Sequence, residues 1–232
     1  TGDNTYRGGT TVTGGALSIS EDANLGRASG SLTLDGGTLR NTGAFTTARS
    51  IDLGAGGGTL QTDADLASTG VVSGTGALIK TGPGTLTLGG ENSYGGGTDL
   101  KQGRLDVTNN SALGTGALAM HEGTTLGFAA DGLALSNPIV FTDAVDPVID
   151  TGAFTATLRG AITGPGDLSK IGSGTLILSG ANSYTGATAV TEGTLRAGAT
   201  NTISAASAHS VVAGATLDLA GFSQSVAALA NA

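Results

Sequence analysis

The sequence predicts an all-β chain coiled as a right-handed parallel β-helix of about ten coils, with little or no helix. Three observations lead to this prediction. A Gly-x-Leu unit recurs about every 22 residues, short runs alternate aliphatic and polar residues, and Gly, Asn, Asp and Ser separate those runs. A coil of three short strands and three turns needs about 20 residues, so each unit corresponds to one coil.

The Gly-x-Leu units run through most of the chain and set the expected coil boundaries. Clear copies stand at Gly15–Leu17, Gly37–Leu39, Gly58–Leu60, Gly84–Leu86, Gly103–Leu105, Gly174–Leu176 and Gly193–Leu195, with looser copies at Gly123, Gly152 and Gly214. Four such units make one larger period.

Short alternating runs are the expected strands. They are "ALSI" at 16–19, "SLTL" at 31–34, "TLTL" at 85–88, "TLIL" at 175–178 and "TLDL" at 216–219. One aliphatic residue in two is the period of a strand with one buried face. Leu86 and Leu88 should therefore point inward, and Thr85 and Thr87 outward.

A sandwich of hairpins is the alternative all-β architecture. Its connecting loops normally differ in length, whereas neighbouring units here are alike in length and pattern. This regularity favours the solenoid, a pectin-lyase-like β-helix with an aliphatic ladder as its core.

A longer sequence motif is also repeated in the chain. "TGPGTLTLGGENSYGGGTDLKQGRLDV" occupies 81–107, "IGSGTLILSGANSYTGATAVTEGTLRA" occupies 171–197, and a truncated copy opens the chain. All three tyrosines, Tyr6, Tyr94 and Tyr184, lie in these copies. We expect the Asn of Asn-x-Tyr to occupy a left-handed bend and the Tyr ring to cover a gap in the core. A row of exposed tyrosines that binds a ligand is the alternative.

These copies resemble the passenger-associated transport repeat of bacterial autotransporters. "LIKTGPGTLTLGGENSYGGGT" at 78–98 and "LSKIGSGTLILSGANSYTGAT" at 168–188 match its fixed places, and each is followed by a Gly-x-Leu unit. We interpret Lys80 and Lys170, which hold equivalent places, as polar markers of a bend. Strict alternation from Leu78 and Leu168 would otherwise turn both lysines inward.

The resemblance implies a passenger fragment on the surface of, or secreted by, a Gram-negative bacterium, without the signal peptide and translocator of that family. We expect a single β-helical domain over 1–232, with a partial repeat at 1–20 and full repeats at about 78–107 and 168–197. Residues 7–80 and 127–160 depart most from the pattern. The second stretch contains the longest departures from the Gly-x-Leu spacing, so we expect loops or irregular coils at about 127–160.

Composition excludes several other classes of protein. A net charge of −8 disfavours nucleic acid, and no run approaches the roughly 18 apolar residues of a membrane helix. The absence of cysteine excludes a disulfide framework and thiol catalysis.

Candidate catalytic or metal-binding groups are few. Asp63 and Asp65 would share a strand face, and Asp143, Asp146 and Asp150 lie close in sequence, so either set could act as acid and base or bind calcium. We interpret them as solvated loop residues, and the two histidines, His121 and His209, as lone exposed side chains. We therefore expect no catalytic, cofactor-binding or metal site.

The leading hypothesis is a non-catalytic passenger fragment for adhesion or host-factor binding, or the stalk that supports such a region and assists its export. Its partners would be a host cell-surface or extracellular-matrix protein, or another passenger, together with its own C-terminal β-barrel translocator. The alternative is a carbohydrate-active enzyme, a polysaccharide lyase or hydrolase, on the same fold. Ice binding through outward Thr rows is a weaker third possibility.

Overall fold

The chain is built almost wholly from short parallel strands. A computed structural model describes residues 2–144 and 147–231, and it divides the chain into two compact units, Thr1–Ala117 and Leu118–Ala232. In the described part of the chain the single helical element is the 3₁₀ helix η1, Asp22–Leu25. The strands wind into about ten coils, which confirms the predicted parallel β-helix. Its right-handedness and its organisation as one domain stay predictions.

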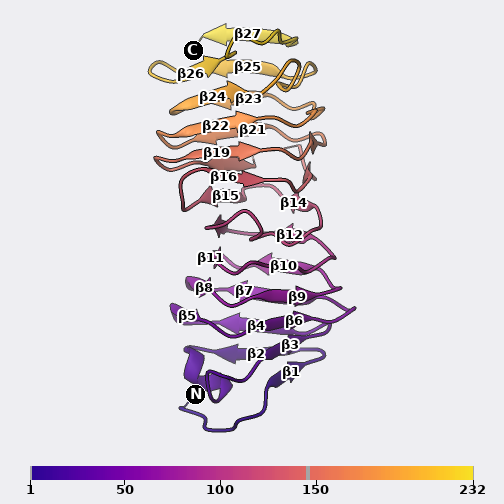
Figure 1. The fold of residues 1–232 in the computed structure, drawn as a ribbon, viewed down its shortest axis with the longest axis vertical. Helices are drawn as coiled ribbons and strands as arrows, with labels where there is room; N and C mark the ends of the chain where they lie inside the picture. Colours follow the sequence, from indigo (N-terminus) through magenta and orange to yellow (C-terminus); the bar gives the residue numbers. More distant parts are fainter. Residues whose placement is uncertain (1, 145–146, 232) are drawn as a thin grey trace. The chain divides into compact units, whose positions relative to one another are not determined.

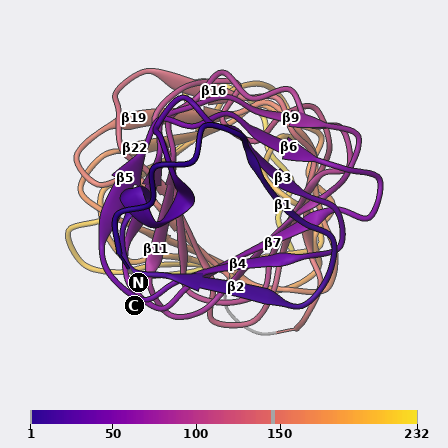
Figure 2. The same ribbon diagram turned by 90° about the horizontal axis from the view of Figure 1, so that it is seen from below.

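The first unit contains three parallel sheets that surround a common interior. Figure 2 shows β1, β3, β6 and β9 on one side, β2, β4 and β7 on a second, and β5 and β11 on a third. Its strands are β1 Thr10–Val12, β2 Ala16–Ile19, β3 Leu32–Leu34, β4 Thr38–Asn41, β5 Phe45–Thr47, β6 Ile51–Leu53, β7 Gly58–Thr62, β8 Leu66–Ser68, β9 Val72–Gly74, β10 Leu78–Thr81, β11 Thr85–Leu88, β12 Thr98–Leu100 and β13 Arg104–Val107.

The second unit repeats this arrangement. Strands β16, β19, β22, β24 and β26 form one sheet, stacked coil upon coil (Figure 1), and two further sheets complete the unit. Its strands are β14 Leu118–Met120, β15 Thr125–Phe128, β16 Leu133–Leu135, β17 Ile139–Phe141, β18 Val148–Asp150, β19 Thr155–Leu158, β20 Ile162–Thr163, β21 Leu168–Ile171, β22 Thr175–Leu178, β23 Thr188–Val190, β24 Thr194–Ala197, β25 Ala208–Val211, β26 Thr216–Asp218 and β27 Ala228–Asn231.

Aliphatic ladders form the core of each unit. Leu86 pairs in register with Leu66 on one neighbouring coil and with Leu105 on the other, and all three are at most 2% exposed. Along β11 the burial alternates, with Leu86 and Leu88 fully buried and the threonines between them partly exposed. The alternation predicted for 85–88 is therefore confirmed, and burial of such ladders is the main stabilising term of the fold.

The expectation of irregular coils at 127–160 was wrong for the described residues. Strands β16 and β19 pair in parallel register, as do β17 and β20. Leu133 pairs with Ala156, whereas in the first unit Leu78 pairs with Thr98, so the coils here are longer. The extra residues fall in the turns and leave the ladder regular, because the strands keep their register.

Residues 7–80 likewise form regular coils. Strands β1 to β10 each pair in parallel with the strand one coil away, as in the register of β4 with β7. Departure from the Gly-x-Leu repeat pattern in this stretch therefore leaves the parallel pairing of the strands unchanged.

Candidate functional site

The two repeat lysines lie inside their coils. Lys80 and Lys170 are 0% exposed. The Lys80 Nζ atom donates hydrogen bonds to the carbonyl oxygens of Thr81, Gly82 and Gln102 at 3.0, 2.8 and 2.9 Å. The interpretation of these lysines as outward markers of a bend was wrong, because the carbonyl groups of the turn supply the acceptors that allow a charged group to be buried.

Lys170 repeats this arrangement in the second unit. Its Nζ atom donates to the carbonyl oxygens of Ile171, Gly172 and Glu192 at 2.8, 2.7 and 3.2 Å. Burial lowers the pKa of both lysines to about 8, against the attraction of nearby carboxylates. In each lysine all three N–H groups of the ammonium donate to backbone carbonyl oxygens. One of the three oxygens, that of Gln102 or Glu192, belongs to the next coil.

The repeat asparagines join three consecutive coils. The Asn92 Oδ1 atom accepts a hydrogen bond from the Val72 amide at 2.7 Å, and its Nδ2 atom donates to the Ala112 carbonyl at 2.6 Å. Asn182 makes the same pair of bonds, at 2.7 Å to Ile162 and 2.6 Å to Thr202.

The asparagines do not occupy left-handed bends, so that expectation was wrong. Among the described residues, the non-glycine positions with positive φ are Asn201 and Ala220. The segment between β11 and β12 forms no strand. The side-chain amide of Asn92 therefore makes the hydrogen bonds to the coils on either side that a strand backbone would otherwise make.

The tyrosines of the two full repeats are core residues. Tyr94 and Tyr184 are 0% exposed, and their hydroxyl groups lie 2.6 and 2.7 Å from the Oγ1 atoms of Thr98 and Thr188. Burial raises the pKa of both phenols, that of Tyr184 to about 12. The core-covering interpretation is confirmed for this pair, whereas Tyr6 of the truncated copy is 42% exposed.

The repeat coils therefore turn their distinctive polar side chains inward. Lysine and asparagine bind the backbone of neighbouring coils, and tyrosine fills the space between them. Such fully bonded polar groups select one register of stacking, because a shifted coil would leave them buried without partners. These side chains cannot contact an external ligand.

The acidic pairs predicted from the sequence are held by structural bonds. Asp63 pairs with Arg40 at 2.6 Å, which lowers the pKa of the carboxyl group, and Asp65 accepts a hydrogen bond from the Thr85 amide at 2.8 Å. The two carboxylates do not converge on a common partner. Their bonds connect neighbouring coils.

The second acidic group is also dispersed. The hydroxyl group of Thr142 and the amide of Glu122 hydrogen-bond Asp143 and lower its pKa. Asp150 accepts a hydrogen bond from the Gly152 amide at 2.8 Å. Asp146 lies outside the described residues. Within the described ranges, no three His, Cys, Asp or Glu side chains gather as metal ligands would.

The histidines differ from each other. The Nδ1 atom of His121 lies 3.1 Å from Asp143, and its side chain is 33% exposed. His209 is only 2% exposed, so its expected exposure was wrong: its position on β25 is an inward one. Its Nδ1 atom lies 3.0 Å from the Ser207 carbonyl oxygen, its Nε2 atom is buried without a partner, and burial lowers its pKa.

Arg49 is a buried structural charge that sequence reasoning missed. Its guanidinium bonds the Asp22 carboxylate at 2.8 and 3.0 Å and the carbonyl groups of Leu25, Gly26, Arg27 and Gly30. This places a fully bonded cation beside the 3₁₀ helix. The alternation pattern contained no signal for it, because Arg49 lies in a turn.

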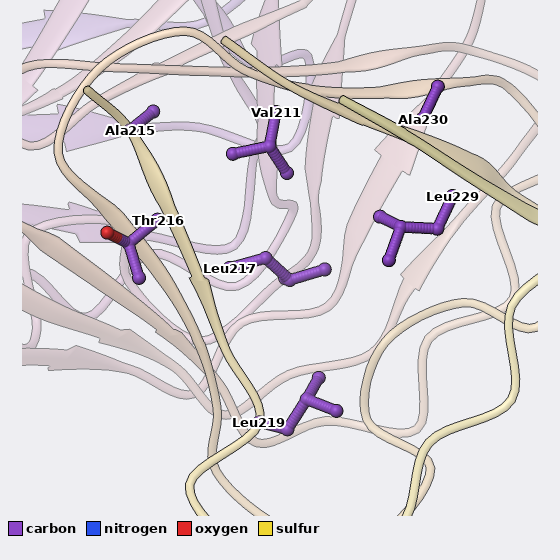
Figure 3. A pocket seen from close by; sticks show the side chains of 7 residues that line it. All are labelled: Val211, Ala215, Thr216, Leu217, Leu219, Leu229 and Ala230. Atoms are coloured by element: carbon purple, nitrogen blue, oxygen red, sulfur yellow. The ribbon is translucent and has the colours of Figure 1, made fainter. Parts of the chain in front are cut away.

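An apolar hollow lies beside β25, β26 and β27. Figure 3 shows the side chains of Leu217, Leu219 and Leu229 around it. Its volume is about 390 Å³, and Leu219 and Leu229 are 43% and 62% exposed. The lining contains one hydroxyl group, that of Thr216, and no charged group, so the hollow offers packing surface rather than reactive chemistry.

A second hollow crosses the outer face of β19, β22 and β24. It measures about 480 Å³, and its lining includes Arg159, Arg196 and Phe222. No motif in the sequence indicated this groove. It depends on residues from four coils that the parallel register brings together.

No helix in the part of the chain that the structure describes is long and apolar enough to cross a membrane.

Comparison with known proteins gives two matches. The family described as Passenger-associated-transport-repeat matches residues 1–19, 78–107 and 168–197, the places of the three copies seen in the sequence. The chain is 38% identical over 137 residues to the Adhesin BmaC autotransporter of Brucella suis biovar 1 (strain 1330). That alignment covers 58% of this chain and 4% of the relative, so the chain corresponds to a small part of the relative's length. No solved structure matches the chain.

Proposed function

We propose that this segment of an autotransporter passenger domain is a non-catalytic part of an adhesive protein, which presents binding surface or supports it on stacked coils. A passenger of this kind lies on the surface of a Gram-negative cell or is released from it. The relative is named an adhesin, which supports an adhesive role here.

The observation that carries the proposal is the inward placement of the repeat's own polar residues. Lys80, Asn92 and Tyr94 are 0%, 5% and 0% exposed. Their bonds hold coil to coil, so the repeat contributes stability and register, while recognition is left to outward side chains on the coils. The repeats would then assist export by forming a stable stack outside the cell.

A non-catalytic role is supported by the carboxylates. Asp63 is paired with Arg40, and Asp65 and Asp150 accept backbone amide bonds. Acid–base hydrolysis of a polysaccharide needs two carboxyl groups facing each other across the substrate. We propose a host cell-surface or extracellular-matrix protein, or a second passenger, as the adhesive partner, and the passenger's own β-barrel translocator as its partner in export.

Binding of the purified chain to host cells and to a panel of matrix proteins tests the adhesive part. A longer passenger segment and an unrelated acidic β-helix serve as positive and negative comparisons. Saturable binding by this chain supports recognition within these coils. Binding by the longer segment alone assigns these coils to support, and binding by neither contradicts an adhesive role.

Surface display tests the export part separately. Residues 78–107 are deleted from the full-length protein as one whole repeat, and a deletion of the same length that removes none of the Lys-Asn-Tyr residues is the control. We expect the first deletion to reduce display more than the second. Equal display of both variants would contradict a special role of the repeat.

A further inference from the structure

The groove over β19, β22, β24 and β26 has a composition that is unusual for this chain. The parallel register places Thr157, Ile177, Arg196 and Asp218 side by side on successive coils. Neighbouring strands lie about 4.8 Å apart, so this row crosses the strands as a continuous line of outward side chains. All of these residues belong to the second unit.

One residue of the groove lining has no side chain. A Cβ atom at Gly198 would collide with the Oγ atom of Ser179 and would lie 3.1 Å from the Ile177 side chain. Gly198 thus lets β24 pack closely against β22 at the groove of about 480 Å³.

A tight turn after β26 supplies the wall of the groove. The Phe222 amide donates to the Leu219 carbonyl at 2.8 Å, and the Ala220 amide donates to the Asp218 carboxylate at 2.8 Å. Ala220 has a φ of 52°, a strained value that this bond helps to hold. The turn places Phe222 at the groove with 39% of the residue exposed.

The two arginines of the groove have different surroundings. The Arg196 Nε atom lies 3.4 Å from the Asp218 carboxylate, so its charge has a partner of opposite sign. Arg159 is exposed, and among the described residues no group hydrogen-bonds or pairs with its guanidinium. Because the whole chain carries a net charge of −8, an unpaired cation that lines the same hollow as an exposed aromatic ring is a local feature rather than a general one.

We propose that this groove binds a carboxylate-bearing polysaccharide. The carboxylate of one sugar residue contacts Arg159, and a sugar ring packs on Phe222. Guanidinium groups bind carboxylates through two parallel hydrogen bonds. The Thr157 and Ser179 hydroxyl groups line the same groove and can bond sugar hydroxyls. An open groove across several coils suits a linear chain better than a compact molecule, and the inference deepens the proposed adhesive function, on which it rests.

Fluorescence anisotropy with labelled oligosaccharides tests the proposal. Hyaluronan and polysialic acid oligosaccharides provide uronate and sialate carboxylates, neutral dextran lacks the charge, and dextran sulfate is a polyanion without carboxylates. We expect binding of one or both carboxylate probes and none of dextran. Arg159→Gln and Phe222→Ala should each weaken binding by about tenfold or more, since each removes one principal contact.

Arg27→Gln, which removes an exposed arginine in the other unit, is the matched control and should leave the affinity unchanged. Circular dichroism checks that each variant is folded. The proposal is overturned if no carboxylate probe binds, if Arg159→Gln binds as the parent does, or if dextran sulfate binds equally well and 0.3 M salt abolishes every signal.

Host-cell binding by the same variants separates the two proposals. Cell binding by a parent chain that binds neither carboxylate oligosaccharide overturns the groove and leaves adhesion standing. Oligosaccharide binding by this chain, with no cell binding by this chain or by the longer passenger segment, supports the groove and contradicts the adhesive role.

Discussion

The Nζ atom of Lys80 lies 2.9 Å from the carbonyl oxygen of Gln102, so a charged side chain buried in one coil is bonded to the backbone of the next. Lys170 stands in the same relation to Glu192 in the second unit, at 3.2 Å. The repeat thus places a charge at an inward position where the paired residues of the neighbouring coils, Leu60 and Leu100, are aliphatic. Three backbone acceptors offset the cost of its burial.

Removal of the buried ammonium should destabilise the fold. Lys80→Ala leaves a cavity and takes the donor from the Gly82 and Gln102 carbonyl groups, so we expect a loss of about 3 kcal/mol in the free energy of unfolding. Lys80→Met keeps most of the volume and should cost less, about 1 to 2 kcal/mol. Urea denaturation followed by circular dichroism measures both.

Lys101→Ala is the matched control, because the Lys101 side chain is 47% exposed and pairs with Asp99 at the surface. Its effect should stay within about 0.5 kcal/mol. A loss for Lys80→Ala no larger than that of the control would contradict a stabilising role for the buried lysine.

The same lysines should make stability rise in mild alkali. Burial lowers the pKa of Lys80 and Lys170 to about 8 from 10.5, so between these values the unfolded chain binds more protons than the folded chain. The free energy of unfolding should therefore increase from about pH 8 towards pH 10. Urea denaturation at pH 7, 8, 9 and 10 measures this slope.

The double variant Lys80→Met and Lys170→Met should show a flatter profile over that range. A parent protein whose stability falls between pH 8 and 9.5, or a double variant with the parent's slope, would contradict the assignment of the effect to these two lysines.

Loss of the buried phenol groups should cost more than loss of the exposed one. Tyr94→Phe leaves the Thr98 hydroxyl, which is 3% exposed, without its partner at 2.6 Å, so we expect a loss of about 1 to 2 kcal/mol. Tyr6→Phe removes an equivalent bond of 2.8 Å to Thr10 at the surface and should cost under about 0.5 kcal/mol.

The pH profile adds a second readout for the tyrosines. Because burial raises the pKa of Tyr94 and Tyr184, the folded chain keeps these protons longer than the unfolded chain, and stability should fall as the pH rises above about 10. The variant Tyr94→Phe should reduce that fall. Equal costs for Tyr94→Phe and Tyr6→Phe would contradict the buried role.

The sequence predicted the fold well because the core signal is local. Alternation at 85–88 identifies inward Leu86 and Leu88 directly, and the spacing of Gly-x-Leu units gives the coil. The same alternation placed Lys80 inward, but the charge of lysine argued against burial. The acceptors that resolve this conflict are the backbone carbonyl groups of Gly82 and Gln102. Every residue has such a group, so the residue types at these positions do not indicate that the groups will bind a buried lysine.

The groove could not be predicted for a related reason. Arg159, Arg196 and Phe222 are far apart in sequence and follow no spacing rule. They meet because four coils stack in register and a turn after β26 projects back over the sheet. Surface sites on a solenoid depend on side chains one coil apart, so they become visible only once the register is known.

His209 should make the second unit sensitive to acid. Burial lowers its pKa below the usual value of 6.5, so at lower pH the unfolded chain binds a proton that the folded chain resists. The free energy of unfolding should therefore decrease as the pH falls through 6.5 towards 5. A proton bound at the buried Nε2 atom would create an N–H group that has no acceptor in the structure. This is the structural reason for the resistance.

The variant His209→Leu replaces the imidazole with an apolar side chain of similar bulk that cannot be protonated. It should therefore reduce the loss of stability between pH 7 and pH 5. His121→Leu is the control for protonation of a half-exposed histidine, since His121 has the Asp143 carboxylate beside it at 3.1 Å. Because His121 is partly exposed and is bonded at the surface, its replacement should not change the acid profile. An acid profile unchanged by His209→Leu would assign the sensitivity to the carboxylates instead.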